Sequence, residues 1–169
     1  MIRKGAFITM DTQARKTALR MFTYGVYLLG MKQDTTYNAS TVSWLSQVSF
    51  DPPLVMVALR NDSLTLRMVL ASKGFTINLL SDRQQEMAGQ FFKQATYQDG
   101  KLNGYAFEPG AQTGAPVFTD APAWLECRVL ESIGRGDHTV IIAEVVEAGV
   151  RDEKAVPLIL RDTPWQYGG

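Results

Sequence analysis

Short apolar segments separated by turn residues dominate the hydrophobic pattern of this chain. Segment 54–59 is an apolar run with two valines that is too short and too β-branched for a surface helix. Alternating Val42, Trp44 and Val48 indicate a strand, which the Asp-Pro-Pro at 51–53 ends. The pattern predicts strands at 26–31, 41–50, 54–59, 75–80, 124–132, 139–148 and 158–161.

Three short helices are predicted between these strands. Asp11 can accept hydrogen bonds at the start of the first helix, and the Asn-Asp-Ser at 61–63 can cap the second. Ser81 and Gln84 have the spacing of a capping box for the third. Residues 94–123 are rich in Gly and Pro, and we expect irregular loops there.

These elements predict one domain over residues 1–169, of the α+β class and mainly β. The length is normal for a single domain, and neither a repeat nor a low-complexity linker divides the chain. At least six strands are expected, and the central ones are apolar on both faces. That pattern favours a closed barrel over an open sheet.

Charge and hydropathy argue against two kinds of partner. Seventeen Lys and Arg balance seventeen Asp and Glu, so no overall field attracts nucleic acid or an anionic membrane. No apolar run reaches the ~18 residues that a membrane span needs. Residues 1–10 contain no apolar core of signal-peptide length. We therefore expect a cytoplasmic protein. Because the net charge is zero, any anionic ligand would have to be held by individual residues around its site.

The chain has one cysteine, Cys127, and one histidine, His138. A single cysteine excludes an intramolecular disulfide and leaves too few ligands for a zinc or iron–sulfur site. Cys127 has the strand spacing of a small core residue, although a catalytic pair with His138 stays arithmetically open. His138 follows Gly136-Asp137 at the mouth of the hairpin expected around residues 134–137, where a lone histidine is usually solvated.

The segment 38–54 is unusually rich in hydroxyl groups. A strand of this kind presents hydrogen-bond donors on both faces, and its backbone can pair with a flat heterocycle laid along it. A solvated edge strand explains the same composition equally well, so both interpretations stay open. The polar residues concerned are Asn38, Ser40, Thr41, Ser43, Ser46, Gln47 and Ser49.

A second group of candidate residues begins with Arg60, just before the second predicted helix. A helix start offers unpaired N–H groups and a partial positive charge, which favours an anion such as phosphate. Ser63 and Thr65 would add hydroxyl donors, and Arg60 a full charge with fork geometry. The alternative is simple capping with Arg60 in solvent. Asp62 disfavours an anion unless its carboxylate turns away.

Seven short motifs fall in order along residues 20–162, and together they resemble the flavin reductase-like family of FMN-binding split barrels. Each is weak alone, and their order is what makes the resemblance specific. The motifs are Ser-Phe-Asp-Pro-Pro-Leu-Val at 49–55, Ser-x-Thr at 63–65, Gly-Phe-Thr-Ile-Asn-Leu-Leu at 74–80, Gly-Ala-Pro-Val at 114–117, Ala-Trp-Leu-Glu-Cys at 123–127, Gly-Asp-His at 136–138 and Pro-Leu at 157–158.

The resemblance implies a dimeric, six-stranded antiparallel Greek-key barrel with one FMN per subunit, FAD being less favoured, and NADH or NADPH as co-substrate. It implies that Ser63 and Thr65 meet the flavin phosphate, with Arg60 beside them, and that His138 lies near the nicotinamide. It also implies that the strand at 41–49 runs along the flavin. The implied flavin-side residues are Ser40, Thr41, Val42, Ser43, Trp44, Ser46, Gln47 and Ser49.

Trp44 departs from the pattern of the members that reduce free flavin. A tryptophan here is similar to the reductase module of diflavin electron carriers and to flavoredoxin-like members. Two functions are therefore expected: an NAD(P)H-dependent flavin reductase that passes reducing equivalents to free flavin or a partner, and an FMN-containing electron carrier that exchanges electrons with a redox protein. The tail at 165–169, Trp-Gln-Tyr-Gly-Gly, matches no motif of the family.

Overall fold

The computed structural model describes residues 9–169, so most of the segment considered above for a signal peptide lies outside the described residues. Its main feature is a seven-stranded antiparallel sheet. The predicted class, antiparallel and mainly β, is confirmed. In spatial order the strands are β2 (Thr36–Val42), β1 (Tyr27–Gln33), β5 (Gly74–Leu79), β10 (Ala123–Gly134), β11 (His138–Val150), β4 (Leu54–Arg60) and β3 (Leu45–Ser49).

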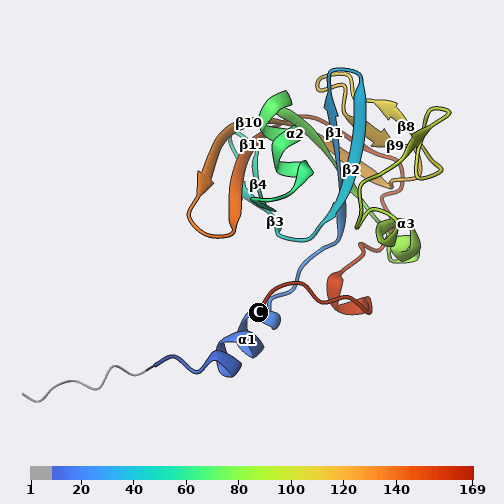
Figure 1. Ribbon diagram of the computed structural model, residues 1–169. Coiled ribbons are helices and arrows are strands. Elements are labelled where there is room, and N and C mark those ends of the chain that lie inside the picture. Colours follow the sequence, from blue (N-terminus) through green and yellow to red (C-terminus); the bar gives the residue numbers. More distant parts are fainter. Residues whose placement is uncertain (1–8) are drawn as a thin grey trace, which may run out of the picture.

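The sheet curls into a split barrel (Figure 1). Its edge strands, β2 and β3, follow one another in the chain and are separated only by Ser43 and Trp44. Since β5 pairs with β1, the order β5, β1, β2–β3, β4 is that of a Greek key. The predicted number of six barrel strands corresponds to this sheet when β2 and β3 are counted as one bent strand.

The hydrogen-bonded ladder is not closed, and the closed barrel that the apolar strands favoured is wrong in this respect. Within residues 9–169 no pairing joins β2 to β3. On β2, the amide of Thr41 donates instead to the carbonyl oxygen of Phe91 at 3.1 Å, and its hydroxyl to that of Ala88 at 2.6 Å. The predicted strand at 41–50 is thus β3 together with the last two residues of β2, because the chain bends at Ser43 and Trp44 from one edge of the sheet to the other. The rest of β2, residues 36–40, was not predicted as a strand.

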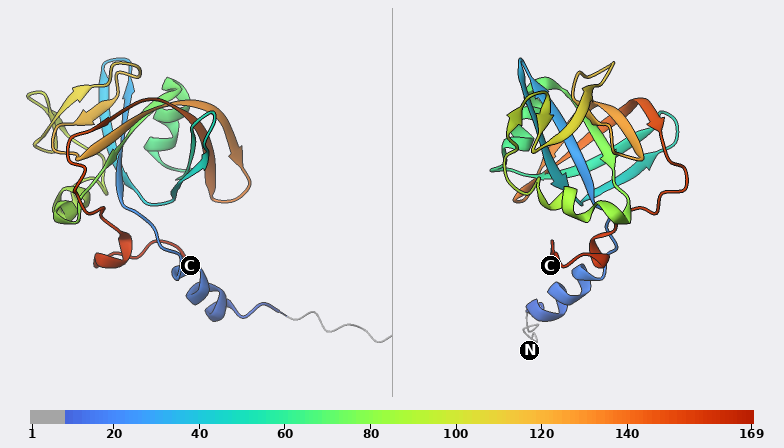
Figure 2. Two further views of the ribbon diagram at one scale, coloured as in Figure 1. Left: turned by 180° about the vertical axis from the view of Figure 1, so that it is seen from behind. Right: turned by 90° about the vertical axis from the view of Figure 1, so that its right-hand side faces the viewer.

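Three helices accompany the barrel: α1 (Thr12–Arg20), α2 (Leu64–Ser72) and α3 (Gln85–Gly89). The predicted caps at Asp11 and Ser63 and the capping box of Ser81 with Gln84 are confirmed. Helix α2 buries Leu66, Met68 and Val69 in the core inside the barrel. Helix α1 buries no residue and stands away from the barrel (Figure 2). No helix in the described part of the chain is long and apolar enough to cross a membrane.

The segment predicted as irregular, 94–123, contains a small second sheet. Its tight hairpins turn at Asp99-Gly100 and Asn103-Gly104, all four residues having positive φ. Asp-Gly and Asn-Gly pairs favour such turns because they tolerate this backbone conformation. The sheet was therefore readable from the sequence and was missed. Its strands are β6 (Tyr97–Gln98), β7 (Lys101–Leu102), β8 (Tyr105–Pro109) and β9 (Pro116–Phe118).

The predicted last strand, 158–161, is also wrong. Only Ile159 forms a bridge, with Gly25, and the backbone amide of Leu160 donates to the carbonyl oxygen of Tyr24 at 2.8 Å. A single 3-10 turn, Leu160–Asp162, follows. It redirects the chain, so that the last residues lie beside α1 (Figure 1). This turn brings the aromatic tail to the barrel rim.

Candidate functional site

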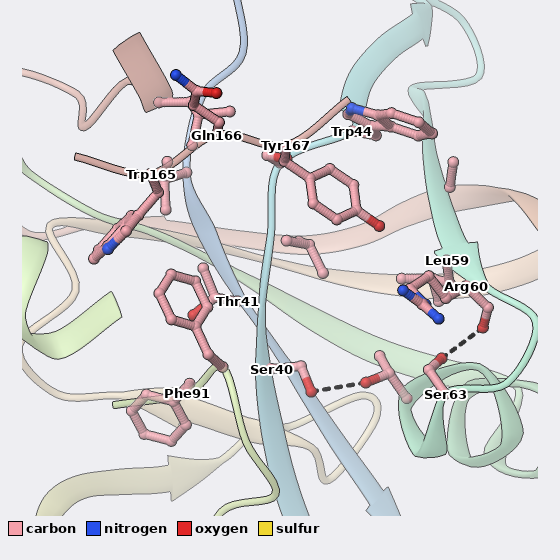
Figure 3. Close-up of a pocket in the computed structure, with 17 residues that line it drawn as sticks. Ser40, Thr41, Trp44, Leu59, Arg60, Ser63, Phe91, Trp165, Gln166 and Tyr167 are labelled. Atoms are coloured by element: carbon pink, nitrogen blue, oxygen red, sulfur yellow. Dashed lines mark hydrogen bonds between the residues drawn. The ribbon is translucent and has the colours of Figure 1, made fainter. Parts of the chain in front are cut away.

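A cavity of about 490 Å³ lies at the bend between β2 and β3 (Figure 3). Its walls come from the end of β2, from the passage between β4 and α2, and from aromatic residues after α3 and in the tail. Its volume is in the range typical of sites for small ligands and cofactors. The lining residues are Val26, Ser40, Thr41, Val42, Ser43, Trp44, Ala58, Leu59, Arg60, Ser63, Thr65, Phe91, Phe92, Leu160, Trp165, Gln166 and Tyr167.

Eight of the sequence-predicted site residues line this cavity: Ser40, Thr41, Val42, Ser43, Trp44, Arg60, Ser63 and Thr65. Ser46, Gln47 and Ser49 do not, because β3 leaves the cavity after the bend. Ser46 and Gln47 are exposed, with the Ser46 hydroxyl donating to the Gln47 carbonyl oxygen and the Gln47 amide donating to that of Ser49. The interpretation as a solvated edge strand therefore describes β3. It does not describe the end of β2, which lines the cavity.

Hydroxyl groups gather at the end of the cavity beside the start of α2. Ser63 is the N-cap of α2: its Oγ accepts from the amide of Leu66 at 3.1 Å and donates to the carbonyl oxygen of Arg60 at 2.7 Å. The hydroxyls of Thr65 and Ser40 lie 2.7 Å apart (Figure 3). The first turn of α2 has no acidic residue. This end of the cavity is therefore suited to an anion.

Arg60 adds the positive charge at the same end. Its Nε and Nη2 donate to the two carboxylate oxygens of Asp62 at 2.9 and 2.7 Å, in the open. The hydrogen bond with Asp62 raises the pKa of Arg60, and the same bond lowers the pKa of Asp62. The carboxylate of Asp62 thus faces the guanidinium, while Ser63 caps the helix. Both partners are well exposed, so this pair can exchange for another anion at small cost.

His138 stands beside the cavity rather than in its lining. It is the first residue of β11, and its backbone is paired with that of Arg60 in β4. Its Nδ1 lies 2.7 Å from a carboxylate oxygen of Asp137 and its Nε2 lies 2.6 Å from the hydroxyl of Tyr167. Its ring packs on Trp44, with centroids 4.6 Å apart. The hydrogen bond from His138 lowers the pKa of Asp137. His138 is therefore not solvated, as a lone turn histidine usually is: Asp137, Tyr167 and Trp44 contact its ring.

The aromatic wall of the cavity was not predicted from the sequence. Trp165 packs edge-on against Phe92, with ring centroids 4.6 Å apart, and Tyr167 packs edge-on against Trp44 at 5.1 Å. Figure 3 shows Trp165 and Tyr167 on the side of the cavity opposite Ser40. The clustering of aromatic residues in the tail was visible in the sequence. The residues against which they pack could not be predicted, because Phe92 and Trp165 lie far apart in the chain.

Cys127 is a core residue, as its spacing predicted. Burial, together with the neighbouring Glu126, raises the pKa of its thiol to about 12. A thiolate nucleophile needs the opposite shift, so the catalytic pair of Cys127 with His138 finds no support.

The arrangement suits a flat ligand that carries an anion at one end. The end of β2 supplies one wall, and the anion end lies between Ser40, Arg60 and Ser63 (Figure 3). The indole N–H of Trp44 is buried and has no hydrogen-bond partner. This nitrogen lies beneath Gly168 of the tail, so it is the indole ring of Trp44 that lines the cavity.

Comparison with known proteins agrees with this geometry. Residues 19–166 match the family described as "Flavin reductase like domain". The NADH flavin reductase of Kitasatospora aureofaciens is 35% identical over 120 residues, which are 70% of this chain and 61% of that protein. This chain therefore spans less than two thirds of that relative's length. The NADH:FMN oxidoreductase of Rhodococcus erythropolis is 31% identical over 86% of this chain and 75% of the relative.

A solved structure gives the same result for the fold. The styrene monooxygenase flavin reductase of Pseudomonas putida S12 superposes with a TM-score of 0.72 at 28% identity, over 88% of this chain and 91% of that one. The family match covers nearly the whole barrel and both ends of the cavity. On this ground, and on the order of its motifs, the chain belongs to the flavin reductase-like family.

Proposed function

We propose that this protein is an NAD(P)H-dependent flavin reductase that holds FMN non-covalently in the cavity at the bend of β2 and β3. The observation that carries the proposal is the cavity itself. It combines a strand wall suited to a flat ring with an anion end made of Arg60, Ser63, Thr65 and the start of α2. The reductases named among the relatives support the reaction class.

In this proposal the flavin ring lies along residues 40–44, where β2 ends. Arg60, now paired with Asp62, and the hydroxyls of Ser63 and Thr65 would hold its phosphate. The single anion end favours FMN over the larger FAD. When bound, the flavin supplies the hydride-accepting chemistry, so no acid or base need be sought among the side chains. The chain binds and orients the reactants.

NADH or NADPH is proposed to approach from the side of His138, and the reducing equivalents then pass to free flavin or to a partner protein. Support comes from the position of His138, which lies beside the cavity and contacts two of its lining residues, Trp44 and Tyr167. An electron carrier would bind the same FMN but would need no pyridine nucleotide. The two functions differ in one measurable step.

That step is the reduction of bound FMN by NADH or NADPH. The protein is reconstituted with FMN, desalted and mixed anaerobically with each nucleotide while the flavin absorbance is followed. We expect a retained flavin band that bleaches fast enough for turnover and slows in His138→Ala. Absence of a retained flavin band contradicts FMN binding. Retained flavin that only a reduced redox protein bleaches would establish the electron carrier instead.

We also propose that the protein forms a homodimer, as the family resemblance implies. Several apolar side chains after α1 and at the turn between β3 and β4 are open to solvent, among them Met21 (78% exposed), Phe22 (61%) and Phe50 (92%). A second copy that covered them would remove this apolar area from water. Sedimentation of the FMN-loaded protein at micromolar concentration should give twice the mass of one chain. A monomer with FMN still bound contradicts the proposal.

A further inference from the structure

Three side chains form a continuous hydrogen-bonded relay at the cavity rim. A carboxylate oxygen of Asp137 lies 2.7 Å from Nδ1 of His138, and Nε2 of His138 lies 2.6 Å from the hydroxyl of Tyr167. A carboxylate accepts only, so it fixes the proton of a neutral imidazole on Nδ1. Nε2 is then an acceptor, and the hydroxyl of Tyr167 donates to it. The orientation of the phenol is thereby set by the other two residues.

Only the last member of this relay faces the ligand space. Tyr167 lines the cavity and His138 does not. The side chain of His138 is 13% exposed and is covered by Trp44 and Tyr167. In Figure 3 the hydroxyl of Tyr167 points into the space between Trp44 and Arg60. A ligand entering from this side therefore meets the tyrosine before it meets the histidine.

The tail segment around Tyr167 is held in place by contacts of its own. The carbonyl oxygen of Gly168 accepts from Nε of Arg20 on α1 at 3.2 Å, and Gly168 packs on the indole of Trp44. Burial raises the pKa of Tyr167, so the phenol stays protonated at neutral pH and remains a donor. Because the hydroxyl of Tyr167 donates its hydrogen bond to His138, its oxygen keeps lone pairs that can accept from a ligand.

We propose that Tyr167, rather than His138, is the residue that contacts the pyridine nucleotide, and that Asp137 and His138 are positioning residues that act through it. The inference rests on the proposed reductase function. The carboxamide of nicotinamide carries an N–H donor for the oxygen of Tyr167 and a carbonyl acceptor. Tyr167 therefore selects for the amide group of the nucleotide.

The test compares Tyr167→Phe, His138→Ala, the double variant and a control, Tyr97→Phe. Tyr97 lies on β6, outside the cavity lining. Each FMN-loaded protein is titrated with NAD⁺, which cannot reduce the flavin, and with its 3-acetylpyridine analogue, which has a methyl ketone in place of the amide. Because the chain has one histidine, the imidazole ¹⁵N resonances of His138 report the relay without assignment.

We expect Tyr167→Phe to weaken NAD⁺ binding about fivefold to tenfold, the effect of one hydrogen bond, and the analogue less than twofold. The losses from Tyr167→Phe and His138→Ala should not multiply in the double variant, because both remove the same contact. The chemical shift of His138 Nε2 should change in the single variant Tyr167→Phe. It should stay at the wild-type value in Tyr97→Phe. FMN affinity is measured for each variant, so that the nucleotide titrations compare proteins with equal flavin loading.

Three results would overturn the inference: NAD⁺ bound by Tyr167→Phe as by wild type, equal weakening for both nucleotides, or losses that multiply. An Nε2 resonance that does not move in Tyr167→Phe would show that the relay is absent in solution, whatever the flavin does. Failure of the proposed function gives a different signature, namely wild-type protein that retains no FMN or is not reduced by NADH or NADPH.

Discussion

Replacing Ser63 with aspartate should separate the two roles of this residue, which caps α2 and lies at the anion end of the cavity. Asp and Ser cap helices about equally well, and a carboxylate also suits a helix start. The change loses the hydrogen bond that Ser63 donates to the carbonyl oxygen of Arg60 at 2.7 Å. A neutral hydrogen bond of this kind contributes about 1 kcal/mol. The free energy of unfolding without ligand should therefore fall by about 1 kcal/mol or less.

The effect of Ser63→Asp on FMN binding should be far larger. The Ser63 hydroxyl has one proton, so its charge-assisted hydrogen bond of about 1.5–3 kcal/mol to the phosphate replaces the bond of about 1 kcal/mol to the Arg60 carbonyl oxygen. Losing the difference corresponds to roughly a 2- to 30-fold change in the dissociation constant. Repulsion between the new carboxylate and the phosphate adds to this loss. Riboflavin has the same ring and side chain without the phosphate. Its affinity should change by about threefold at most, because the wall at residues 40–44 is untouched.

Fluorescence titration with FMN and with riboflavin gives both dissociation constants, and urea denaturation gives the stability. Ser63→Ala is the matched control for the cap: it should lower the stability by about 1 kcal/mol and weaken FMN less than Ser63→Asp does. Equal weakening of FMN and riboflavin by Ser63→Asp would refute the reasoning. So would unchanged FMN binding, because either result places the phosphate elsewhere.

Two further predictions concern buried residues of β10. Glu126 is fully buried, and its carboxylate accepts from the amides of Gln112 (3.0 Å) and Thr113 (2.7 Å) and from the Thr113 hydroxyl (2.7 Å). Glu126→Ala should lower the free energy of unfolding in urea by about 2–4 kcal/mol, and Glu126→Gln by less than Glu126→Ala. A loss under about 1 kcal/mol for the alanine variant contradicts this account. Since the thiol of Cys127 has a pKa of about 12 and is buried, a thiol reagent at pH 8 should label it only after unfolding, and rapid labelling of the native protein in mass spectra would show the opposite.

The sequence by itself determined the features that depend on neighbouring residues. Strand periodicity located the barrel strands other than most of β2, and side-chain spacing located the caps at Asp11, Ser63 and Ser81. The hydroxyl-rich segment and the Arg60 helix start were both identified as candidate sites, and most of their residues line one cavity. The ordered motifs predicted the family, which the comparisons confirmed. Local pattern suffices here because backbone preferences and capping act over a few residues.

Only the tertiary structure decided how these segments meet. The bend at Ser43 and Trp44 turns β3 away, so Ser46, Gln47 and Ser49 leave the cavity although their composition matches that of residues 40–43. The 3-10 turn at Leu160–Asp162 sends the tail across the rim, where Tyr167 meets a histidine 29 positions earlier in the chain. Contacts of this kind depend on the path of the whole chain around the barrel. A pattern read along a few residues carries no information about that path, so neither the relay nor the aromatic wall could be predicted.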